Sequence, residues 1–265
     1  MSYIAITASQ TDANSPVDQN LMDTIRLDLA DHESRLLAAF TFGNNSILDD
    51  FVTQQSASGV AASVWETGGT APDVVSQHQA RVKGVGGGSF SIMAASPSKL
   101  QINIAEEYIA VMEMRVYKAA GTNDDFFFGF QDSALSSAAA ATVGDKTDMI
   151  GFYRDAAAAD WFFRTANTAG GGGSTTSGAI GVSTSWGIYR LTVTCSATAG
   201  NRQVIVEYGT SLAGMAQVSG SPFTTNLPTG VNLRPFFGVA PSVATTLDLR
   251  VDYCLAYLTG RPLAA

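Results

Sequence analysis

From Ile47 onward, the hydrophobic residues come in short runs rich in Val, Ile, Phe, Tyr and Thr, separated by clusters of Gly, Ser, Asn and Pro. This pattern is typical of β-strands joined by turns. The clearest predicted strands are Tyr108–Tyr117, Phe126–Phe130, Met149–Arg154, Trp161–Thr165, Tyr189–Cys195, Val204–Tyr208, Pro235–Ala240 and Leu247–Leu258. About a dozen such strands predict a mainly β fold over residues 43–265, an antiparallel jelly-roll β-sandwich.

The last of these runs shows the alternation most plainly. Every second position from Leu247 to Tyr257 is Leu, Val or Tyr, and most positions between them are polar. Because side chains alternate between the two faces of a strand, this run predicts one core face and one partly polar face. We also expect a strand over Val74–Val82, a turn over Gly84–Ser89, and a loop from Gly170 through the Ser/Thr-rich stretch that follows.

The first part of the chain has a different period. Ser15 is a good N-cap, Pro16 suits the first helical position, and Asp18 completes a variant of the capping box, so a helix is expected to begin here and run to about Ala39. Its hydrophobic seam follows heptad spacing, with positions Met22, Ile25, Leu29, His32, Leu36 and Ala39. Either this seam packs on the chain's own sandwich or it forms a coiled coil between chains.

We favour the coiled coil, because no helical neighbour is predicted in the same chain. Residues 15–42 are therefore predicted to be a short oligomerising helix. Residues 1–14 are predicted to be an extended attachment arm, and the apolar side chains of Tyr3, Ile4 and Ile6 are too few to form a core of their own.

Composition and charge exclude several classes of binding partner. Only 14% of the 265 residues are charged and the net charge is −8, with no basic run, so nucleic acid and anionic membranes are poor partners. The first ten residues carry no Lys or Arg, and no apolar stretch is long enough for a membrane span, so we expect no signal peptide and no membrane insertion. Cys195 and Cys254 lie in apolar runs and are expected to be buried thiols, with a single core disulfide as the alternative.

The residues needed for common catalytic and metal sites are scarce. His32 and His78 are the two histidines, the G-x-S-x-G motif is absent, and neither His nor Cys has zinc-ligand spacing. We therefore predict no nucleophilic catalysis, no metal and no cofactor. The paired acids are Asp49 with Asp50, Asp124 with Asp125, and Asp248 with Asp252.

None of these acidic pairs clearly predicts glycoside hydrolysis, which needs two carboxyl groups across a cleft. Asp248 and Asp252 share strand parity, but Arg250 lies between them, which favours a charge-balanced solvent face. Asp124 and Asp125 are interpreted as turn residues. Aromatic residues of the type used in sugar binding are Trp65, Trp161, Trp186, Tyr153 and Tyr189, although each lies in or beside a strand, where core packing is the default.

The stretch Ser9–Arg26, followed by the heptad seam, resembles the start of minor structural proteins of tailed bacteriophages, in which an arm and a helix trimerise and dock on the virion. The rest resembles the concanavalin-like jelly-roll modules of phage tail fibres, head fibres and capsid decoration proteins. The segments that carry this second resemblance are Ile150–Arg154, Trp186–Val193, Leu227–Thr229, Leu233–Phe237 and Leu249–Tyr253.

The resemblance implies a homotrimeric, non-enzymatic virion structural protein, either a capsid decoration protein or a head fibre. Its arm would bind the major capsid protein or another virion protein, and it would be assembled in the host cytoplasm and reside in the virion. The alternative is a tail fibre or receptor-binding protein that recognises a host surface glycan. A sandwich-fold glycosidase is the third hypothesis.

Overall fold

The structure, a computed structural model, describes residues 46–49, 65–70, 73–76, 79–85, 90–97, 100–118, 124–132, 148–154, 160–167, 173–182, 185–241 and 246–259. The predicted arm and helix, with Tyr3, Ile4, Ile6 and the six seam residues, lie outside these ranges, as does His78. Within the described ranges, no helix is long and apolar enough to cross a membrane.

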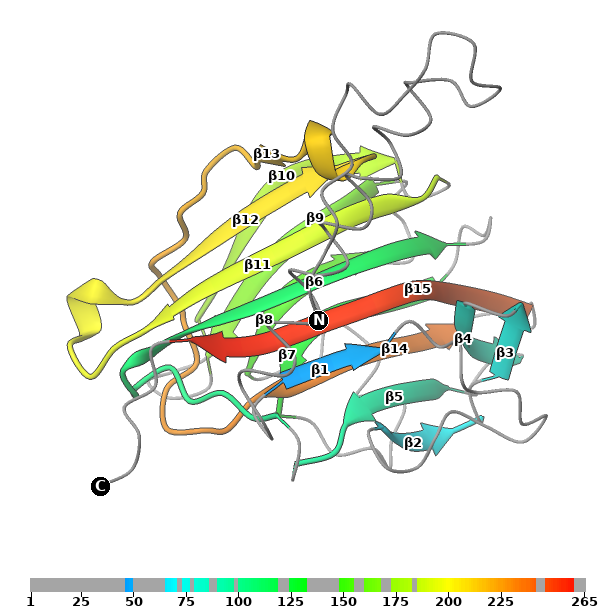
Figure 1. Ribbon diagram of the computed structural model, residues 1–265, viewed down its shortest axis with the longest axis horizontal. Helices are drawn as coiled ribbons and strands as arrows, with labels where there is room; N and C mark the ends of the chain where they lie inside the picture. Colours follow the sequence, from blue (N-terminus) through cyan, green and yellow to red (C-terminus); the bar gives the residue numbers. More distant parts are fainter. Residues whose placement is uncertain are drawn as a thin grey trace, which may run out of the picture.

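The described residues form two antiparallel sheets that face each other (Figure 1). The eight-stranded sheet has the order β13-β12-β11-β6-β15-β4-β3, with β1 also paired to β15, and the seven-stranded sheet has the order β10-β9-β8-β7-β14-β5-β2. In Figure 1, β12, β11, β6 and β15 lie in front, and β9, β8 and β7 lie behind them. The predicted β-sandwich is confirmed.

The strands of the eight-stranded sheet are β1 (Ser46–Asp49), β3 (Asp73–Ser76), β4 (Gln79–Val85), β6 (Tyr108–Lys118), β11 (Gly187–Cys195), β12 (Gln203–Gly209), β13 (Ala216–Gln217) and β15 (Thr246–Thr259). Those of the seven-stranded sheet are β2 (Trp65–Gly69), β5 (Ser91–Ala95), β7 (Asp124–Gln131), β8 (Met149–Arg154), β9 (Asp160–Asn167), β10 (Gly173–Val182) and β14 (Arg234–Pro241). All eight clearest predicted strands are confirmed, each within a few residues of its expected ends.

Aromatic rings from both sheets meet at the centre of the core. Phe128 of the seven-stranded sheet lies 5.0 Å from the ring of Tyr189 on β11, 4.8 Å from Trp161 and 5.1 Å from Phe152, measured between ring centroids. All four side chains are fully buried. Edge-to-face packing of this kind adds to the large area of apolar surface removed from water, so this cluster joins the two sheets.

The predicted core face of the last strand is wrong beyond Val251. A β-bulge falls between Val251 and Tyr253, where β15 shifts its register against β6. A bulge inserts one extra residue, so every later side chain changes face. As a result Cys254 and Ala256 belong to the core, while Tyr253 and Tyr257 point outward.

Three other local predictions are also corrected. The expected strand Val74–Val82 is divided into β3 and β4, which pair with each other as a hairpin. The Ser/Thr-rich stretch after Gly170 is not a loop, because β10 pairs with β9 along most of its length. Asp124 and Asp125 are not turn residues either, since β7 begins with them, opposite Pro241 and Ala240.

Candidate functional site

The outward face of the eight-stranded sheet carries a row of charged side chains on adjacent strands. On β11, Tyr189 and Leu191 belong to the core, so Arg190 between them points outward. Its cross-strand partners are Glu113 on β6 and Glu207 on β12. Residues directly opposite each other in a sheet share a face, so one guanidinium lies between two carboxylates.

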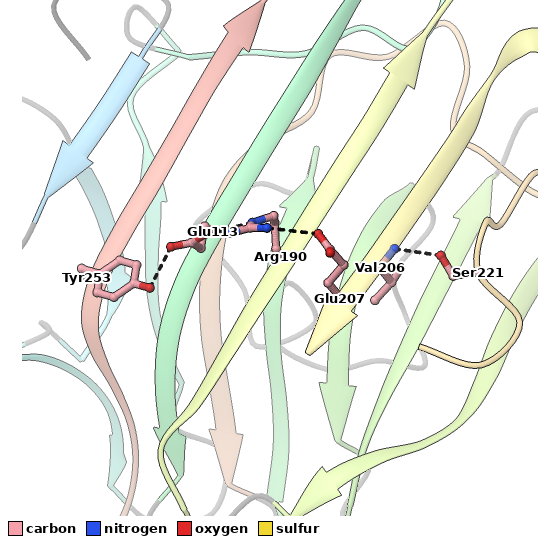
Figure 2. Close-up of polar contacts among 6 residues, drawn as sticks. All are labelled: Glu113, Arg190, Val206, Glu207, Ser221 and Tyr253. Carbon is pink, nitrogen blue, oxygen red and sulfur yellow. Dashed lines mark hydrogen bonds and ion pairs between the residues drawn. The ribbon is translucent and has the colours of Figure 1, made fainter. Parts of the chain in front are cut away.

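Arg190 binds both carboxylates (Figure 2). Its Nε and Nη2 donate to Glu113 Oε2 at 2.9 and 2.6 Å, and its Nη1 donates to Glu207 Oε2 at 3.3 Å. The Tyr253 hydroxyl donates to the other Glu113 oxygen, Oε1, at 2.8 Å. We call these four residues the carboxylate network. It joins β12, β11, β6 and β15, the four strands that form the middle of the face.

The network is tightly held at Glu113 and more open at Glu207. The side chain of Glu113 is 6% exposed, against 28% for Glu207 and 32% for Arg190. Burial alone would lower the pKa of Arg190, but the hydrogen bond and charge of Glu113, together with those of Glu207, raise it above its usual value. Because its pKa is raised, Arg190 keeps its charge over the whole working pH range of a protein. Burial also raises the pKa of the nearby Tyr257 phenol.

The edge of the sheet beside the network is fixed by Ser221. Its hydroxyl accepts a hydrogen bond from the Val206 backbone N–H at 2.9 Å (Figure 2). It also accepts one from the side-chain amide of Gln217, at 3.2 Å. These contacts hold the segment after β13 along β12, and so fix the strand that carries Glu207.

A second group of side chains lies on the same face, further along β6 and β15 from the carboxylate network. Arg115 donates from Nη1 to Asp252 Oδ2 at 2.7 Å, and its Cζ lies 5.0 Å from the centroid of the Trp186 ring. The ring centroids of Trp186 and Tyr117 are 5.4 Å apart, and the Arg250 Cζ lies 5.5 Å from the centroid of the Tyr117 ring. We call these five residues the aromatic–arginine cluster. It is half-exposed: the Arg115 and Asp252 side chains keep 39% and 20% of their surface.

Together these two groups can bind a polar ligand that has apolar faces. Tryptophan and tyrosine rings offer flat apolar surface, and the neighbouring guanidinium and carboxylate groups offer donors and acceptors in fixed positions. The ion pairs hold the charged groups in place before a ligand arrives, which lowers the entropic cost of binding. Within the described ranges, no group of three or more His, Cys, Asp or Glu residues is arranged to hold a metal ion.

The structure separates the candidate aromatic residues. Trp65, Trp161 and Tyr189 are core residues with 0–1% exposure. Trp186 lies on the outward face of the eight-stranded sheet and Tyr153 lies on the outward face of the other sheet, so they cannot share a ligand.

The structure also shows where members of the acidic pairs and the two cysteines lie. Asp252 binds Arg115 on β6, and Asp248 lies opposite Lys83 of β4 in the strand register. Asp49 is the last residue of β1, and Asp50 lies outside the described ranges. Cys195 and Cys254 are both buried and are not joined in a disulfide, which confirms the prediction of two buried thiols.

Sequence reasoning did not find the carboxylate network. A weak signal exists, because Glu113, Arg190 and Glu207 are charged residues inside runs that are otherwise β-forming. Charged residues at such positions, flanked by apolar ones, mark the outward face of a half-buried strand. What the sequence does not disclose is that β11 lies between β6 and β12 in this register, which brings the three together.

No protein-family model matches the chain, and no curated protein matches its sequence. Among solved structures, the carbohydrate recognition domain of Emp46p is similar with a TM-score of 0.51 and 8% identity, covering 81% of this chain and 96% of that one. Arcelin-5, a lectin-like defense protein from Phaseolus vulgaris, has a TM-score of 0.50 and 11% identity, covering 82% and 98%. A β-1,3-glucanase from Mycobacterium marinum has a TM-score of 0.49 and 9% identity, covering 80% and 97%.

The likenesses to the Emp46p domain and to arcelin-5 show the fold alone, a lectin-like jelly-roll sandwich. The concanavalin-like part of the predicted resemblance is therefore confirmed, and the bacteriophage part stays a prediction. A fold of this kind is compatible with binding or with catalysis, so function must be argued from the residues of the site.

Proposed function

We propose that this chain is a glycan-binding module that holds its ligand on the outward face of the eight-stranded sheet. The observation that carries the proposal is the position of Arg115, whose guanidinium binds Asp252 and also lies over the Trp186 ring. A sugar presents hydroxyl groups around an apolar C–H face. The guanidinium and the carboxylate can bind the hydroxyl groups, and the Trp186 ring can pack against the C–H face. The lectin-like neighbours support the same class of ligand, because they include a carbohydrate recognition domain.

Binding fits the carboxylates better than hydrolysis does. A glycosidase needs one carboxyl group to protonate the leaving oxygen and a second to act as nucleophile or base. Here Glu113 and Glu207 both bind Arg190, and Glu113 also accepts the Tyr253 hydroxyl. Both oxygens of Glu113 and one oxygen of Glu207 thus help to hold the face together. We propose a non-enzymatic role on this ground.

The setting on a phage particle is a proposal from the sequence resemblance. In that setting, a glycan-binding sandwich is suited to a tail fibre or receptor-binding protein that contacts a host surface glycan. The homotrimer, the capsid or other virion partner, and assembly in the host cytoplasm belong to the same proposal. They depend on residues 1–42, which lie outside the described ranges.

The test is a glycan array on the purified full chain, followed by calorimetry with the sugars that bind. The variants Trp186→Ala and Tyr117→Ala remove the planar surface and should weaken binding about tenfold, since each loses buried apolar area and an aromatic contact contributes on the order of 0.5–1.5 kcal/mol beyond that area. Ile109→Ala is the matched control, because Ile109 is 39% exposed on the same face of β6. A glycan array without binding, or equal affinity in all three variants, contradicts the proposal.

A further inference from the structure

The outward face of the seven-stranded sheet carries a second group of residues at β8 and β9. On β9, Phe163 and Thr165 are buried, so Phe162 and Arg164 point to the opposite side. Tyr153 on β8 is the cross-strand partner of Phe162. This face lies on the other side of the sandwich from Trp186, so the two groups form separate sites.

The three side chains form a compact group. The Tyr153 and Phe162 rings are 5.7 Å apart with an interplanar angle of 33°, and the Arg164 guanidinium carbon lies 6.0 Å from the Tyr153 ring centroid. All three side chains are half-exposed. The group borders a buried cluster on the same face, against which Tyr153 packs, so its partly exposed side is the side that a ligand can reach.

The hydrogen bonding of Arg164 differs from that of three other arginines on the outward faces. Arg115, Arg190 and Arg234 each form an ion pair with a carboxylate. Within the described part of the chain, no carboxylate pairs with Arg164, and its Nε is a buried donor without an acceptor. Its cross-strand neighbours, Gly151 on β8 and Thr176 on β10, bring no negative charge.

A buried donor without an acceptor costs free energy, on the order of 1–3 kcal/mol, which an incoming acceptor would recover. The guanidinium has a planar fork of donors that matches the two oxygens of a carboxylate. Phe162 beside it provides a flat apolar surface for the C–H face of a ring. The group therefore has the chemistry to bind a sugar ring that carries a carboxylate.

We propose that Arg164, Tyr153 and Phe162 form a second binding site, specific for an acidic sugar such as a uronate. The chain has a net charge of −8, so polyanions are repelled at long range and binding depends on this local guanidinium. This site does not depend on the Trp186 face, so an experiment can contradict the proposal for one of the two sites without affecting the other.

The experiment is calorimetric titration of the full chain with a short oligogalacturonate and with its methyl ester, which removes the charge and keeps the ring. The wild-type chain should bind the acid about tenfold more tightly than the ester, as expected for a charge-assisted hydrogen bond. Arg164→Gln should weaken binding of the acid about tenfold, and Arg164→Lys should recover part of this loss. Arg202→Gln, the same chemical change in the turn between β11 and β12, where Arg202 donates to the backbone carbonyls of Ser196 and Ala197, should leave it unchanged.

Three results would overturn the proposal: no binding of the acid, equal binding of acid and ester, or unchanged affinity in Arg164→Gln. A poly-glutamate peptide that binds through Arg164 as tightly as the sugar would also overturn it, in favour of a peptide ligand. Glycan-array binding that is lost in Trp186→Ala and kept in Arg164→Gln separates this site from the proposed glycan face. Far-UV circular dichroism and a urea midpoint show that each variant is folded.

Discussion

The Arg190 guanidinium donates two hydrogen bonds to a single oxygen of Glu113, at 2.6 and 2.9 Å, across the outward face of the eight-stranded sheet. The other Glu113 oxygen accepts from Tyr253, so this almost buried carboxylate is bonded from the strands on both sides. An ion pair in this position fixes the face, but its removal is costly because one charge would be left without its partner.

The first prediction concerns this pair. Arg190→Ala should destabilise the fold by about 2–3 kcal/mol, somewhat below the cost of breaking a fully buried pair, because the Arg190 side chain is 32% exposed. The double variant Glu113→Gln/Arg190→Ala should lose less than Arg190→Ala alone, since it removes the unpaired charge. Urea unfolding measures both. Strictly additive costs of the two single variants would show that the pair is not coupled.

The second prediction compares two tyrosines with opposite hydrogen bonding. The Tyr189 hydroxyl is buried and has no hydrogen-bond partner in the described part of the chain, whereas the Tyr253 hydroxyl donates to Glu113. Tyr189→Phe should leave the free energy of unfolding unchanged or raise it by up to about 1 kcal/mol. Tyr253→Phe should lower it by about 1–2 kcal/mol, because a hydrogen bond to a charged group is lost. The opposite order of the two urea midpoints would contradict this reading of the core.

The third prediction is a loss of stability at alkaline pH. Burial raises the pKa values of the Tyr189, Tyr208 and Tyr257 phenols, and it raises the pKa of the Cys195 thiol to about 12. Below about pH 8.5 for the thiol and about pH 10 for the phenols, the folded and the unfolded chain both keep these protons. The contribution of these groups to stability is therefore constant there. Above those values the unfolded chain releases protons that the folded chain retains.

Each such group should therefore lower the free energy of unfolding by about 1.4 kcal/mol per pH unit above its unfolded pKa. Urea midpoints between pH 7 and 11 measure the slope. Tyr189→Phe should make the decline shallower. A stability that rises between pH 9 and 11 would refute the assignment.

The fourth prediction concerns the thiols. Cys195 and Cys254 are buried thiols outside any disulfide, and the raised pKa of Cys195 keeps it protonated and unreactive. Neither thiol should react with Ellman's reagent in the native protein on the timescale of minutes, and both should react in concentrated urea. Cys195→Ser and Cys254→Ser identify each signal. Rapid native labelling of either thiol would show that the sandwich opens locally at that strand.

Much of the fold could be predicted from the sequence, because a strand with one core face has a period of two. β11 and β12 follow this rule throughout, with core residues such as Leu191 and Val206 at alternate positions. β15 breaks the rule at its bulge, where one extra residue near Asp252 reverses the faces without any compositional signal. β10 was missed for another reason: it lies at an edge and is rich in Ser, Thr and Gly, so pairing with β9 rather than burial defines it.

The candidate sites were less predictable, because each is assembled from strands that are distant in the sequence. Trp186 and Tyr153 were both candidates by residue type, but only the sheet order places them on opposite sides of the sandwich. Arg164 gave no signal at all in the sequence. Its importance comes from what its neighbours lack: Gly151 and Thr176 carry no charge, and no carboxylate among the described residues pairs with its guanidinium.

The last prediction concerns Gly151, next to Arg164. A Cβ atom at Gly151 would lie 2.6 Å from the Phe128 carbonyl oxygen and 2.7 Å from Cζ of the Phe127 ring, which covers this glycine. Gly151→Ala should therefore destabilise the fold by about 1–3 kcal/mol through overpacking. Gly178→Ala is the matched control, because a Cβ there has no neighbour within 4 Å and an alanine should be neutral or slightly stabilising.

The same substitution tests the link between packing and binding on this face. Phe127 pairs in register with Tyr153, so an alanine that displaces the Phe127 ring should also shift Tyr153 under the Arg164 guanidinium. Gly151→Ala should then weaken binding of the acidic sugar while binding to the Trp186 face is unchanged. Urea midpoints and titrations of both variants measure these effects. Equal stability of the two variants would show that the backbone at Gly151 yields, so that its lack of a side chain is not required.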